Sequence, residues 1–193
     1  LFLKTRILTI DVDGTVLSTG MKVDWAFRGY NPHQRKVPSY YPISAYLAET
    51  GHVLRLHNRP GDVHDGKSSI TFFRGVFQQI DQMFQKSYEL RFRMDGAFLQ
   101  HDVLSLLETR KASYAVKMPF WRYLHLQQKI KNCKKWQRVE KGVDGFTDTV
   151  SIKKWDQEIQ VFIYRKRVFH KTRKNYQLDL FDPDDGTWEY SAI

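Results

Sequence analysis

Cysteine is almost absent from this sequence, which has one, Cys133, among 193 residues. A single cysteine excludes a disulfide within the chain and any zinc site built from several cysteines, and its free thiol suits a reducing compartment. No apolar run approaches the roughly 20 residues that a membrane-spanning helix needs, and the first residues do not resemble a signal peptide. We therefore expect a soluble, intracellular protein without a membrane partner.

Acidic residues are also scarce relative to basic ones, 21 against 31, which gives a formal net charge of +10. Residues 115–138 contain seven basic residues and no acid, and residues 161–176 contain six basic residues and no acid. Such stretches bind polyanions by releasing counterions, and four of the five tryptophans lie in the same half of the chain. Nucleic acid is therefore the favoured partner, and a merely solvated basic surface is the alternative. We predict that basic residues contact DNA by charge and that one tryptophan contacts it by stacking. These residues are Arg35, Lys36, Arg122, Lys129, Lys134, Lys135, Arg165, Lys166, Arg167, Lys171, Arg173, Lys174 and Trp188.

The first predicted domain, residues 1–118, follows the pattern of an α/β fold. Residues 7–13 alternate between apolar and polar side chains, which predicts a strand with Asp11 and Asp13 on one face. Two segments that flank Thr50-Gly51 predict a hairpin, and apolar residues at helical spacing predict two amphipathic helices. The expected order is strands at 7–13, 43–49 and 52–58, a helix at 66–86, a strand at 89–95, a helix at 98–110 and a strand at 113–117. This order predicts an antiparallel meander that continues into right-handed βαβ crossovers.

The second predicted domain, residues 119–193, has a different sequence pattern. Residues 121–139 predict a basic helix whose inward face includes Tyr123, Leu126 and Ile130. The remainder predicts an antiparallel β-subdomain, with strands expected at 149–155, 158–168, 176–180 and 187–193. The chain starts without methionine and stops directly after TWEYSA, a stretch typical of a strand interior, so we expect a fragment of a longer protein.

The stretch ILTIDVDGTVLST, residues 7–19, is compatible with two chemistries. The first is that of haloacid-dehalogenase-like phosphatases, in which a DVDGT motif supplies an aspartate nucleophile, here Asp11, and an acid–base aspartate, here Asp13. The distal acidic motif of such enzymes has a weak counterpart in GDVHD, residues 61–65. That stretch follows the polar turn HNRP, and only 47 residues separate Asp13 from Gly61, which leaves no room for several βα units. The phosphatase is therefore the last of our alternatives.

The second chemistry pairs Asp13 with Asp95. Each of them ends a predicted strand before a glycine, and the elements between them suit strands one and four of a ribonuclease-H-like sheet, where these strands are neighbours. Two adjacent carboxylates can hold Mg²⁺ ions that activate a nucleophile and stabilise a leaving oxygen. Hard oxygen ligands favour Mg²⁺, with Mn²⁺ as a substitute, and no organic cofactor is expected. Two unrelated acids at strand ends are the competing interpretation.

Several motifs in one order make the sequence resemble the DDE-type transposases of bacterial insertion sequences, DDE domain group 1. They are IDVDGTVL, GYNP, PSYYPISAYLAETGHVLRLHNRPGDVHD, LRFRMDGAF and YAVK, followed by the late basic β-segments. The resemblance covers nearly the whole chain. It departs at Asp62, where the family commonly has Asn, and at Ala97, where it commonly has Gly. Neither departure affects Asp13 or Asp95.

The resemblance implies a ribonuclease-H-like core, with a mixed five-stranded sheet and helices, interrupted after the fifth strand by a β-rich insertion subdomain. It implies that Asp13 and Asp95 are the first two catalytic acids and metal ligands. A third acid, a Glu, is implied on a helix after the insertion, which we expect beyond Ile193. Asp11 is either a further metal ligand or a supporting neighbour. We expect this fragment to bind DNA and to be catalytically poor or inactive alone.

The implied reaction is Mg²⁺-dependent cleavage at transposon ends, followed by attack of the freed 3′-hydroxyl on target DNA. The implied partners are double-stranded DNA, both transposon ends and target, and further copies of the protein on that DNA. The implied location is the bacterial cytoplasm, at the nucleoid. The first alternative is a non-catalytic DNA-binding module derived from a transposase.

Overall fold

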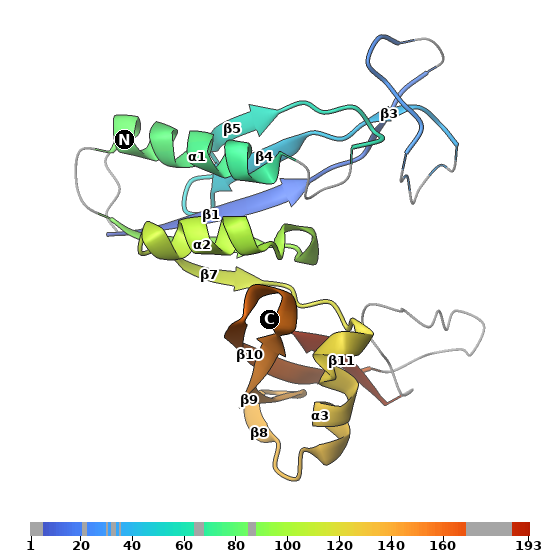
Figure 1. The fold of residues 1–193 in the computed structure, drawn as a ribbon, viewed down its shortest axis with the longest axis vertical. Coiled ribbons are helices and arrows are strands. Elements are labelled where there is room, and N and C mark those ends of the chain that lie inside the picture. Colours follow the sequence, from blue (N-terminus) through green and yellow to red (C-terminus); the bar gives the residue numbers. More distant parts are fainter. Residues whose placement is uncertain are drawn as a thin grey trace. The chain divides into compact units, whose positions relative to one another are not determined.

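The computed structural model describes residues 6–193 except 21–22, 30, 32–33, 35, 64–67, 85–87 and 169–186. The chain forms two compact units, Leu1–Val116 and Lys117–Ile193. Figure 1 shows that the first unit combines a sheet with helices and that the second is mostly β-structure. In the described part of the chain, no helix is both long and apolar enough to cross a membrane.

The first unit is built on a five-stranded mixed sheet. Its strands are β1 (Ile7–Gly14), β4 (Ile43–Leu47), β5 (Val53–His57), β6 (Glu89–Met94) and β7 (Ser113–Val116), in the spatial order β5-β4-β1-β6-β7. Strand β4 pairs antiparallel with β1 and β5, whereas β6 pairs parallel with β1 and β7. The first and fourth predicted strands are therefore neighbours, and the expected ribonuclease-H-like α/β fold class is confirmed.

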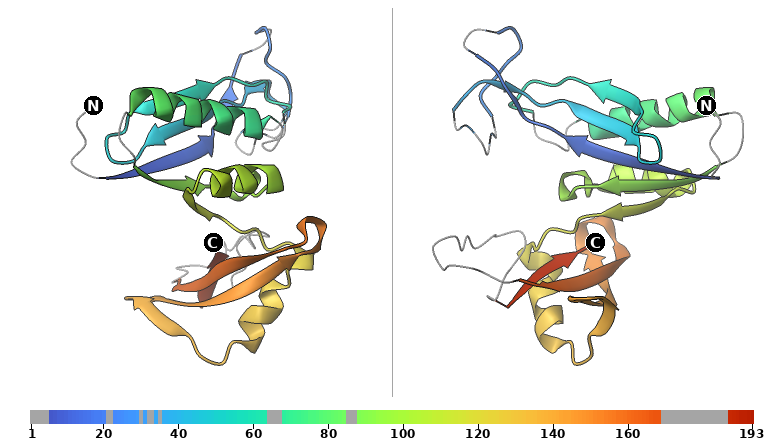
Figure 2. Two further views of the ribbon diagram at one scale, coloured as in Figure 1. Left: turned by 60° about the vertical axis from the view of Figure 1, so that its left-hand side comes forward. Right: turned by 180° about the vertical axis from the view of Figure 1, so that it is seen from behind.

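Two helices, α1 (Ser69–Met83) and α2 (His101–Thr109), cover one face of this sheet (Figure 2). The apolar alternation of β1 directs Leu8 and Ile10 into the core on that face, where both are 0% exposed. Phe73 and Phe77, four residues apart on α1, pack on Phe92 of β6 with ring centroids 5.9 and 5.3 Å away. The same alternation leaves the polar side chains of β1 on the opposite face.

A small two-stranded sheet in the first unit was not predicted. It pairs β2 (Leu17–Ser18) with β3 (Ser39–Tyr40). Strands of two residues are too short to produce a recognisable alternation, which explains the omission. A 3₁₀ turn, η1 (Gly96–Phe98), links β6 to α2.

The second unit is a four-stranded antiparallel sheet in the order β11-β10-β9-β8. Its elements in chain order are the 3₁₀ turn η2 (Arg122–Leu124), α3 (Leu126–Asn132), β8 (Gln137–Glu140), β9 (Val143–Ile152), the 3₁₀ turn η3 (Lys153–Trp155), β10 (Gln157–Arg167) and β11 (Trp188–Ala192). The predicted antiparallel β-subdomain is thus observed. The strand expected at 176–180 lies outside the described residues.

The helix predicted within residues 121–139 is wrong in extent, because α3 has seven residues and residues 137–140 form β8. His125 has a left-handed backbone with φ of 54°, which separates η2 from α3, and Cys133 is extended and ends the helix. Leu124 and Leu126 are buried on either side of His125. Tyr123, predicted to face inward, is 55% exposed.

Arg165 of β10 lies between two tryptophans in the second unit. Its guanidinium carbon is 4.4 Å from the ring centre of Trp136 and 4.2 Å from that of Trp188. Two of its nitrogens donate to Asp144 Oδ2 at 3.1 and 3.0 Å. A planar guanidinium can stack on both rings and donate from its edge, which a lysine ammonium cannot do. This Trp–Arg–Trp stack therefore joins β10 to β11 and to the segment before β8.

The phenylalanine cluster predicts a large loss of stability for Phe73→Ala. Phe73 is 0% exposed and contacts the rings of Phe92 and Phe98, so its truncation leaves a cavity and should cost about 3–5 kcal/mol of unfolding free energy. Phe27→Ala, at a position that is 51% exposed, is the matched control and should cost less than about 0.5 kcal/mol. Urea unfolding followed by circular dichroism measures both. Equal losses would contradict the packing described.

The Trp–Arg–Trp stack predicts that Arg165→Lys destabilises the second unit by about 1–2 kcal/mol, because the charge stays while both stacking contacts are lost. Arg138→Lys, at an exposed position of β8, is the control and should change the unfolding free energy by less than about 0.5 kcal/mol. Thermal unfolding followed by tryptophan fluorescence reports both variants. The stack has no stabilising role if the two variants unfold at the same temperature.

Candidate metal centre and nucleic-acid surface

Asp13 and Asp95 lie at the carboxyl ends of two neighbouring parallel strands. The ladder between β1 and β6 pairs Val12 with Met94, and each aspartate is the next residue along its own strand. Adjacent strands are about 4.8 Å apart, so the two strands deliver their aspartates to the same edge of the sheet. Both aspartates are exposed. The sequence pattern placed each at a strand end, and the pairing of the strands brings the two ends together.

The turn after Asp13 is packed against residues from distant parts of the chain. The Gly14 amide donates to Asp13 Oδ1 at 2.8 Å, and a Cβ on Gly14 would lie 2.8 Å from the Tyr41 hydroxyl oxygen. The Arg59 guanidinium carbon is 5.0 Å from the ring centre of Tyr41, and Arg59 Nε donates to the Tyr41 carbonyl at 3.1 Å. Arg59 is 3% exposed. The motifs PSYYP (residues 38–42) and RPGD (residues 59–62) thus pack against residues 13–15, which we call the DGT turn. The sequence analysis did not predict this role.

Asp95 begins a tight turn that a buried aromatic residue anchors. Its backbone is extended, with φ of −75° and ψ of 164°, and its carbonyl accepts the Phe98 amide at 3.0 Å. Phe98 is 1% exposed and packs against Phe73 with ring centroids 5.9 Å apart. The hydrophobic core therefore holds the turn from which the Asp95 side chain emerges.

Asp11 forms an ion pair on the face of the sheet opposite the helices. It pairs in register with Arg93 of β6, and Arg93 Nε and Nη2 donate to Asp11 Oδ1 and Oδ2, both at 2.5 Å. The hydrogen bond with Asp11 raises the pKa of Arg93 above its ordinary value. Both carboxylate oxygens of Asp11 therefore accept from one guanidinium, two residues before Asp13.

The chemistry of the donor set at this edge fits a hard divalent cation. Carboxylate oxygens are the ligands that Mg²⁺ and Mn²⁺ prefer, and Asp13 and Asp95 supply them from adjacent strands. Within the described ranges, no group of three or more His, Cys, Asp or Glu residues is arranged to hold a metal ion. The geometry thus provides two of the three acids that the family resemblance implies.

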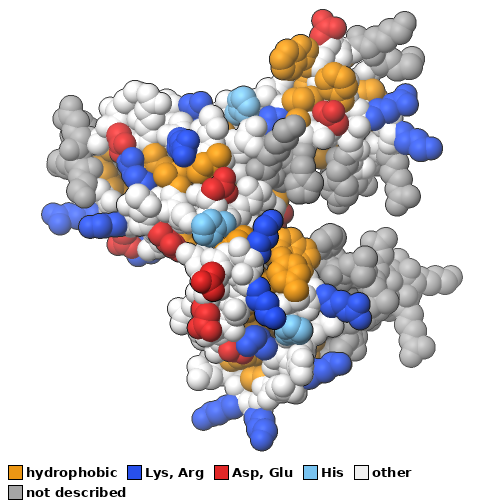
Figure 3. All heavy atoms as spheres, in the orientation of Figure 1, with side chains coloured by type: hydrophobic (Ala, Val, Ile, Leu, Met, Phe, Trp, Pro, Cys, Tyr) orange, Lys and Arg blue, Asp and Glu red, His pale blue; other side chains and the backbone are white. Residues whose placement is uncertain are grey.

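The residues predicted to contact DNA divide into three groups. Those that are exposed are Lys36, Arg122, Lys134, Lys135, Lys166 and Arg167. Those that are engaged within the second unit are Lys129, Arg165 and Trp188. Those that lie outside the described residues are Arg35, Lys171, Arg173 and Lys174. Figure 3 shows basic side chains spread over the visible face of the second unit, with fewer acidic ones among them.

Lys129 forms an ion pair with an acid on β9. Lys129 Nζ donates to Asp148 Oδ2 at 2.9 Å, and the Thr149 amide donates to Asp148 Oδ1 at 2.7 Å. Partial burial opposes ionisation of Asp148, but these two hydrogen bonds outweigh it and lower the pKa of the carboxyl below its ordinary value. Lys129 therefore offers less charge to a ligand than an exposed lysine does.

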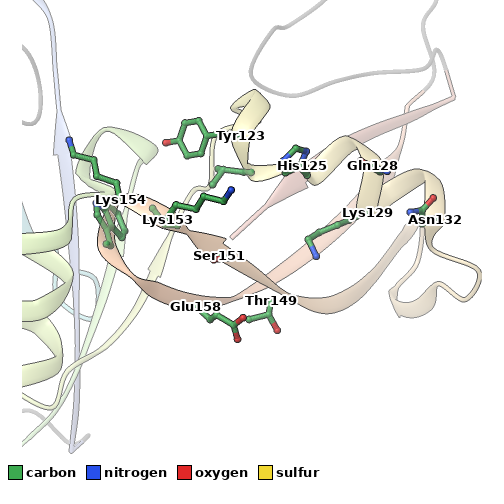
Figure 4. Close-up of a pocket in the computed structure, with 13 residues that line it drawn as sticks. Tyr123, His125, Gln128, Lys129, Asn132, Thr149, Ser151, Lys153, Lys154 and Glu158 are labelled. Atoms are coloured by element: carbon green, nitrogen blue, oxygen red, sulfur yellow. The ribbon is translucent and has the colours of Figure 1, made fainter.

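A groove of about 810 Å³ lies between α3 and β9 in the second unit, and we name it the α3 groove (Figure 4). Its lining includes Tyr123, Leu124, His125, Gln128, Lys129, Asn132, Thr149, Ser151, Ile152, Lys153, Lys154, Trp155 and Glu158. Of these, Lys129 is among the residues predicted to contact DNA. The signal available was the spacing of His125, Gln128 and Asn132, which is that of one helix face.

Comparison with known proteins gives a family for this chain. No curated protein sequence matches it. Among solved structures it is similar to piggyBac transposase in the cryo-EM structure of a synaptic complex with hairpin DNA, with 9% sequence identity and a TM-score of 0.47 over 95% of this chain and 32% of that one. The chain thus spans about a third of the length of that transposase. The profile of the family described as Transposase DDE domain group 1 matches residues 3–175, so the chain belongs to the DDE-domain transposases of group 1.

Proposed function

We propose that this chain carries the first two catalytic acids of a DNA transposase that cleaves transposon ends with Mg²⁺ and joins the freed 3′-hydroxyl to target DNA. The observation that carries this proposal is the position of Asp13 and Asp95 at the ends of two adjacent parallel strands in a chain of the DDE family. The third acid implied by the family resemblance stays a prediction. So do assembly of several copies on DNA and a location at the bacterial nucleoid.

In this proposal Asp13 and Asp95 would hold the metal, and the surrounding residues fix the geometry of the two carboxylates. Mg²⁺ held there would supply Lewis-acid polarisation of the scissile phosphate and a lower pKa for the attacking water or 3′-hydroxyl. In cleavage the water oxygen bonds to phosphorus as the bond to the leaving oxygen breaks, and in strand transfer the 3′-hydroxyl takes the place of water. Tyr41 and Arg59 support the DGT turn, and Phe98 supports the turn at Asp95, so that both carboxylates stay at one sheet edge.

We assign Asp11 to a supporting role and not to the metal. Its two oxygens accept from Arg93, and an ion pair that spans β1 and β6 directly below the two aspartates holds these strands in register. The pair also neutralises a third carboxylate on that face. The same arrangement weighs against the phosphatase alternative, because a carboxylate bound at both oxygens by a guanidinium is a poor nucleophile.

The non-catalytic DNA-binding module is the second candidate. It is favoured by one observation, the exposed basic side chains of the second unit, which suit a polyanion without any metal site. Metal binding by Asp13 and Asp95 distinguishes it from the catalytic proposal, because a module kept for its basic surface has no need of a metal site.

Asparagine substitutions test the metal assignment. Asp13→Asn and Asp95→Asn should each weaken Mn²⁺ binding by about 10-fold or more, because each removes a charged oxygen ligand. Asp11→Asn is the matched control and should have a much smaller effect. Electron paramagnetic resonance titration of Mn²⁺ measures affinity without requiring the third acid, and DNA cleavage by the full-length protein is the second readout. If Asp11→Asn weakened Mn²⁺ binding as much as Asp13→Asn does, Asp11 would have to be a metal ligand.

The exposed basic residues predict a steep salt dependence of DNA binding. Neutralisation of about four phosphates or more gives a slope of about −4 or steeper in a plot of log affinity against log salt for duplex DNA. Lys134→Ala combined with Lys135→Ala should reduce that slope by about 2, because each lysine contributes roughly one phosphate contact. Fluorescence anisotropy at a series of salt concentrations gives both slopes. If the affinity of the unsubstituted chain for duplex DNA did not change with salt concentration, the exposed basic residues would not be contacting phosphates.

A further inference from the structure

Arg93 lies on the face of the first sheet that also carries the two aspartates of the candidate metal centre. Asp95 continues the extended backbone of β6, so the side chains of Arg93 and Asp95 leave the same side of the strand, with Cα atoms about 7 Å apart. That side is opposite α1 and α2, because Met94 between them is buried. Asp13 shares it, since Val12 beside it is buried in the same way.

Asp11 holds one edge of the Arg93 guanidinium. The two residues are in register on adjacent strands, and Nε and Nη2 of Arg93 donate to the two carboxylate oxygens of Asp11. A guanidinium is planar, and its N–H groups form a rigid fork. Because one carboxylate accepts from two of its nitrogens, the plane of the group and the direction of its remaining donors are fixed.

The other edge of this guanidinium is accessible. The side chain of Arg93 is 59% exposed, whereas that of Asp11 is only 19% exposed. On the side away from Asp11, the register neighbour of Arg93 is Ala115 of β7, whose methyl group accepts no hydrogen bond. Among the residues that the structure describes, Asp11 is the one hydrogen-bond partner of the Arg93 side chain. The remaining N–H groups are therefore available to a ligand.

Arg91 provides a comparison within the same strand. It lies on the same face, two residues before Arg93, and its Nε and Nη2 both contact a single oxygen, Glu89 Oε1, at 2.8 and 2.6 Å. Both partners are about half exposed, at 49% and 51%. A surface pair of this kind contributes little to stability. Arg93 differs because its partner belongs to another strand, is more deeply buried and accepts at both oxygens.

We propose that Arg93 donates to a phosphate of the DNA strand next to the one that is cleaved, and that Asp11 orients it for this contact. The proposal rests on the proposed function, in which Asp13 and Asp95 hold the metal at the cleaved phosphate. Arginine suits the contact, because its parallel N–H groups match two oxygens of a phosphate. Arg93 is then a DNA-binding residue and Asp11 a positioning residue.

Affinity for a duplex that carries the transposon end tests the contact. The measurement uses the full-length protein, fluorescence anisotropy and Ca²⁺, which also takes oxygen ligands. Arg93→Gln should weaken binding by about 10-fold, because a charge-assisted contact with phosphate is lost. Arg91→Gln is the matched control and should weaken it by less than about 2-fold. Asp11→Asn keeps the charge of Arg93 but releases its orientation, so its loss should lie between the two.

Single methylphosphonate substitutions in the same duplex identify the phosphate. Each replaces one charged oxygen by a methyl group, and the series covers about three phosphates on either side of the cleaved bond. At the phosphate that Arg93 contacts, the substitution should weaken binding of the unsubstituted protein by about 10-fold and have little effect on Arg93→Gln, because the two changes remove the same interaction. In Arg91→Gln the same methylphosphonate should retain its full effect.

Electron paramagnetic resonance titration of Mn²⁺ separates a DNA contact from an effect on the metal centre. Arg93→Lys keeps a positive charge opposite Asp11 and loses the rigid fork. It should retain Mn²⁺ affinity within about 2-fold but weaken binding of the duplex by about 3-fold or more, with a smaller methylphosphonate effect. This variant also carries the test if Arg93→Gln, which leaves Asp11 without its partner, does not fold.

The outcomes separate this inference from the proposed function. Equal losses for Arg93→Gln and Arg91→Gln, or additive losses at every phosphate of the series, would overturn the contact, while Mn²⁺ binding by Asp13 and Asp95 leaves the transposase proposal intact. Unchanged or tighter DNA binding by Asp11→Asn would overturn its positioning role. If Arg93→Lys lost as much Mn²⁺ affinity as Asp13→Asn does, Arg93 would act on the metal centre and not on DNA. Failure of the unsubstituted protein to bind both Mn²⁺ and the duplex would contradict both proposals.

Discussion

The parallel pairing of β1 with β6 is the interaction on which the candidate metal centre depends. Neither Asp13 nor Asp95 is close to the other in sequence, and only the Val12–Met94 register places the two at one sheet edge. A slip by one residue would turn the apolar side chains of β1 away from the helices. Because Leu8 and Ile10 are fully buried on that side, the hydrophobic core opposes such a slip. Packing on one face of the sheet thereby determines the chemistry available at its end.

The two turns that carry the aspartates are supported from different directions. On the Asp13 side, Tyr41 lies against Gly14 and is itself held by the buried Arg59. On the Asp95 side, Phe98 reaches into the aromatic cluster of the core. A carboxylate site needs its ligands held within a fraction of an ångström, and side chains locked by packing are the means by which a fold achieves this. The family motifs that contain neither Asp13 nor Asp95 therefore also have a physical role.

Some charged side chains of this protein form ion pairs within the chain, and others are exposed on its surface. Arg93 is paired with Asp11 across the first sheet, and Arg165 is enclosed by two tryptophans and Asp144 in the second unit. The net charge of +10 still favours a polyanionic partner. Composition counts charges and does not distinguish a cation committed to an internal partner from one exposed on the surface. Most of the residues that line the α3 groove, by contrast, are neutral, so a count of charges does not identify them.

Local patterns in the sequence were sufficient to predict most helices and strands, because alternation and helical spacing depend on neighbours within a few residues. The order of motifs, together with the resemblance they carry, was sufficient for the fold class, whereas the choice of Asp13 and Asp95 as catalytic acids stays a prediction. The short β2–β3 pair, the end of α3 at Asn132 and the exposure of Tyr123 were not predictable in this way, since each depends on contacts or backbone turns that leave no periodic signal. The amino-acid sequence by itself determined which residues carry acidic, basic and aromatic chemistry. Only the tertiary structure decided which of them meet, because the pairing of β1 with β6, the capture of Asp11 by Arg93 and the groove beside α3 all arise from residues far apart in the chain.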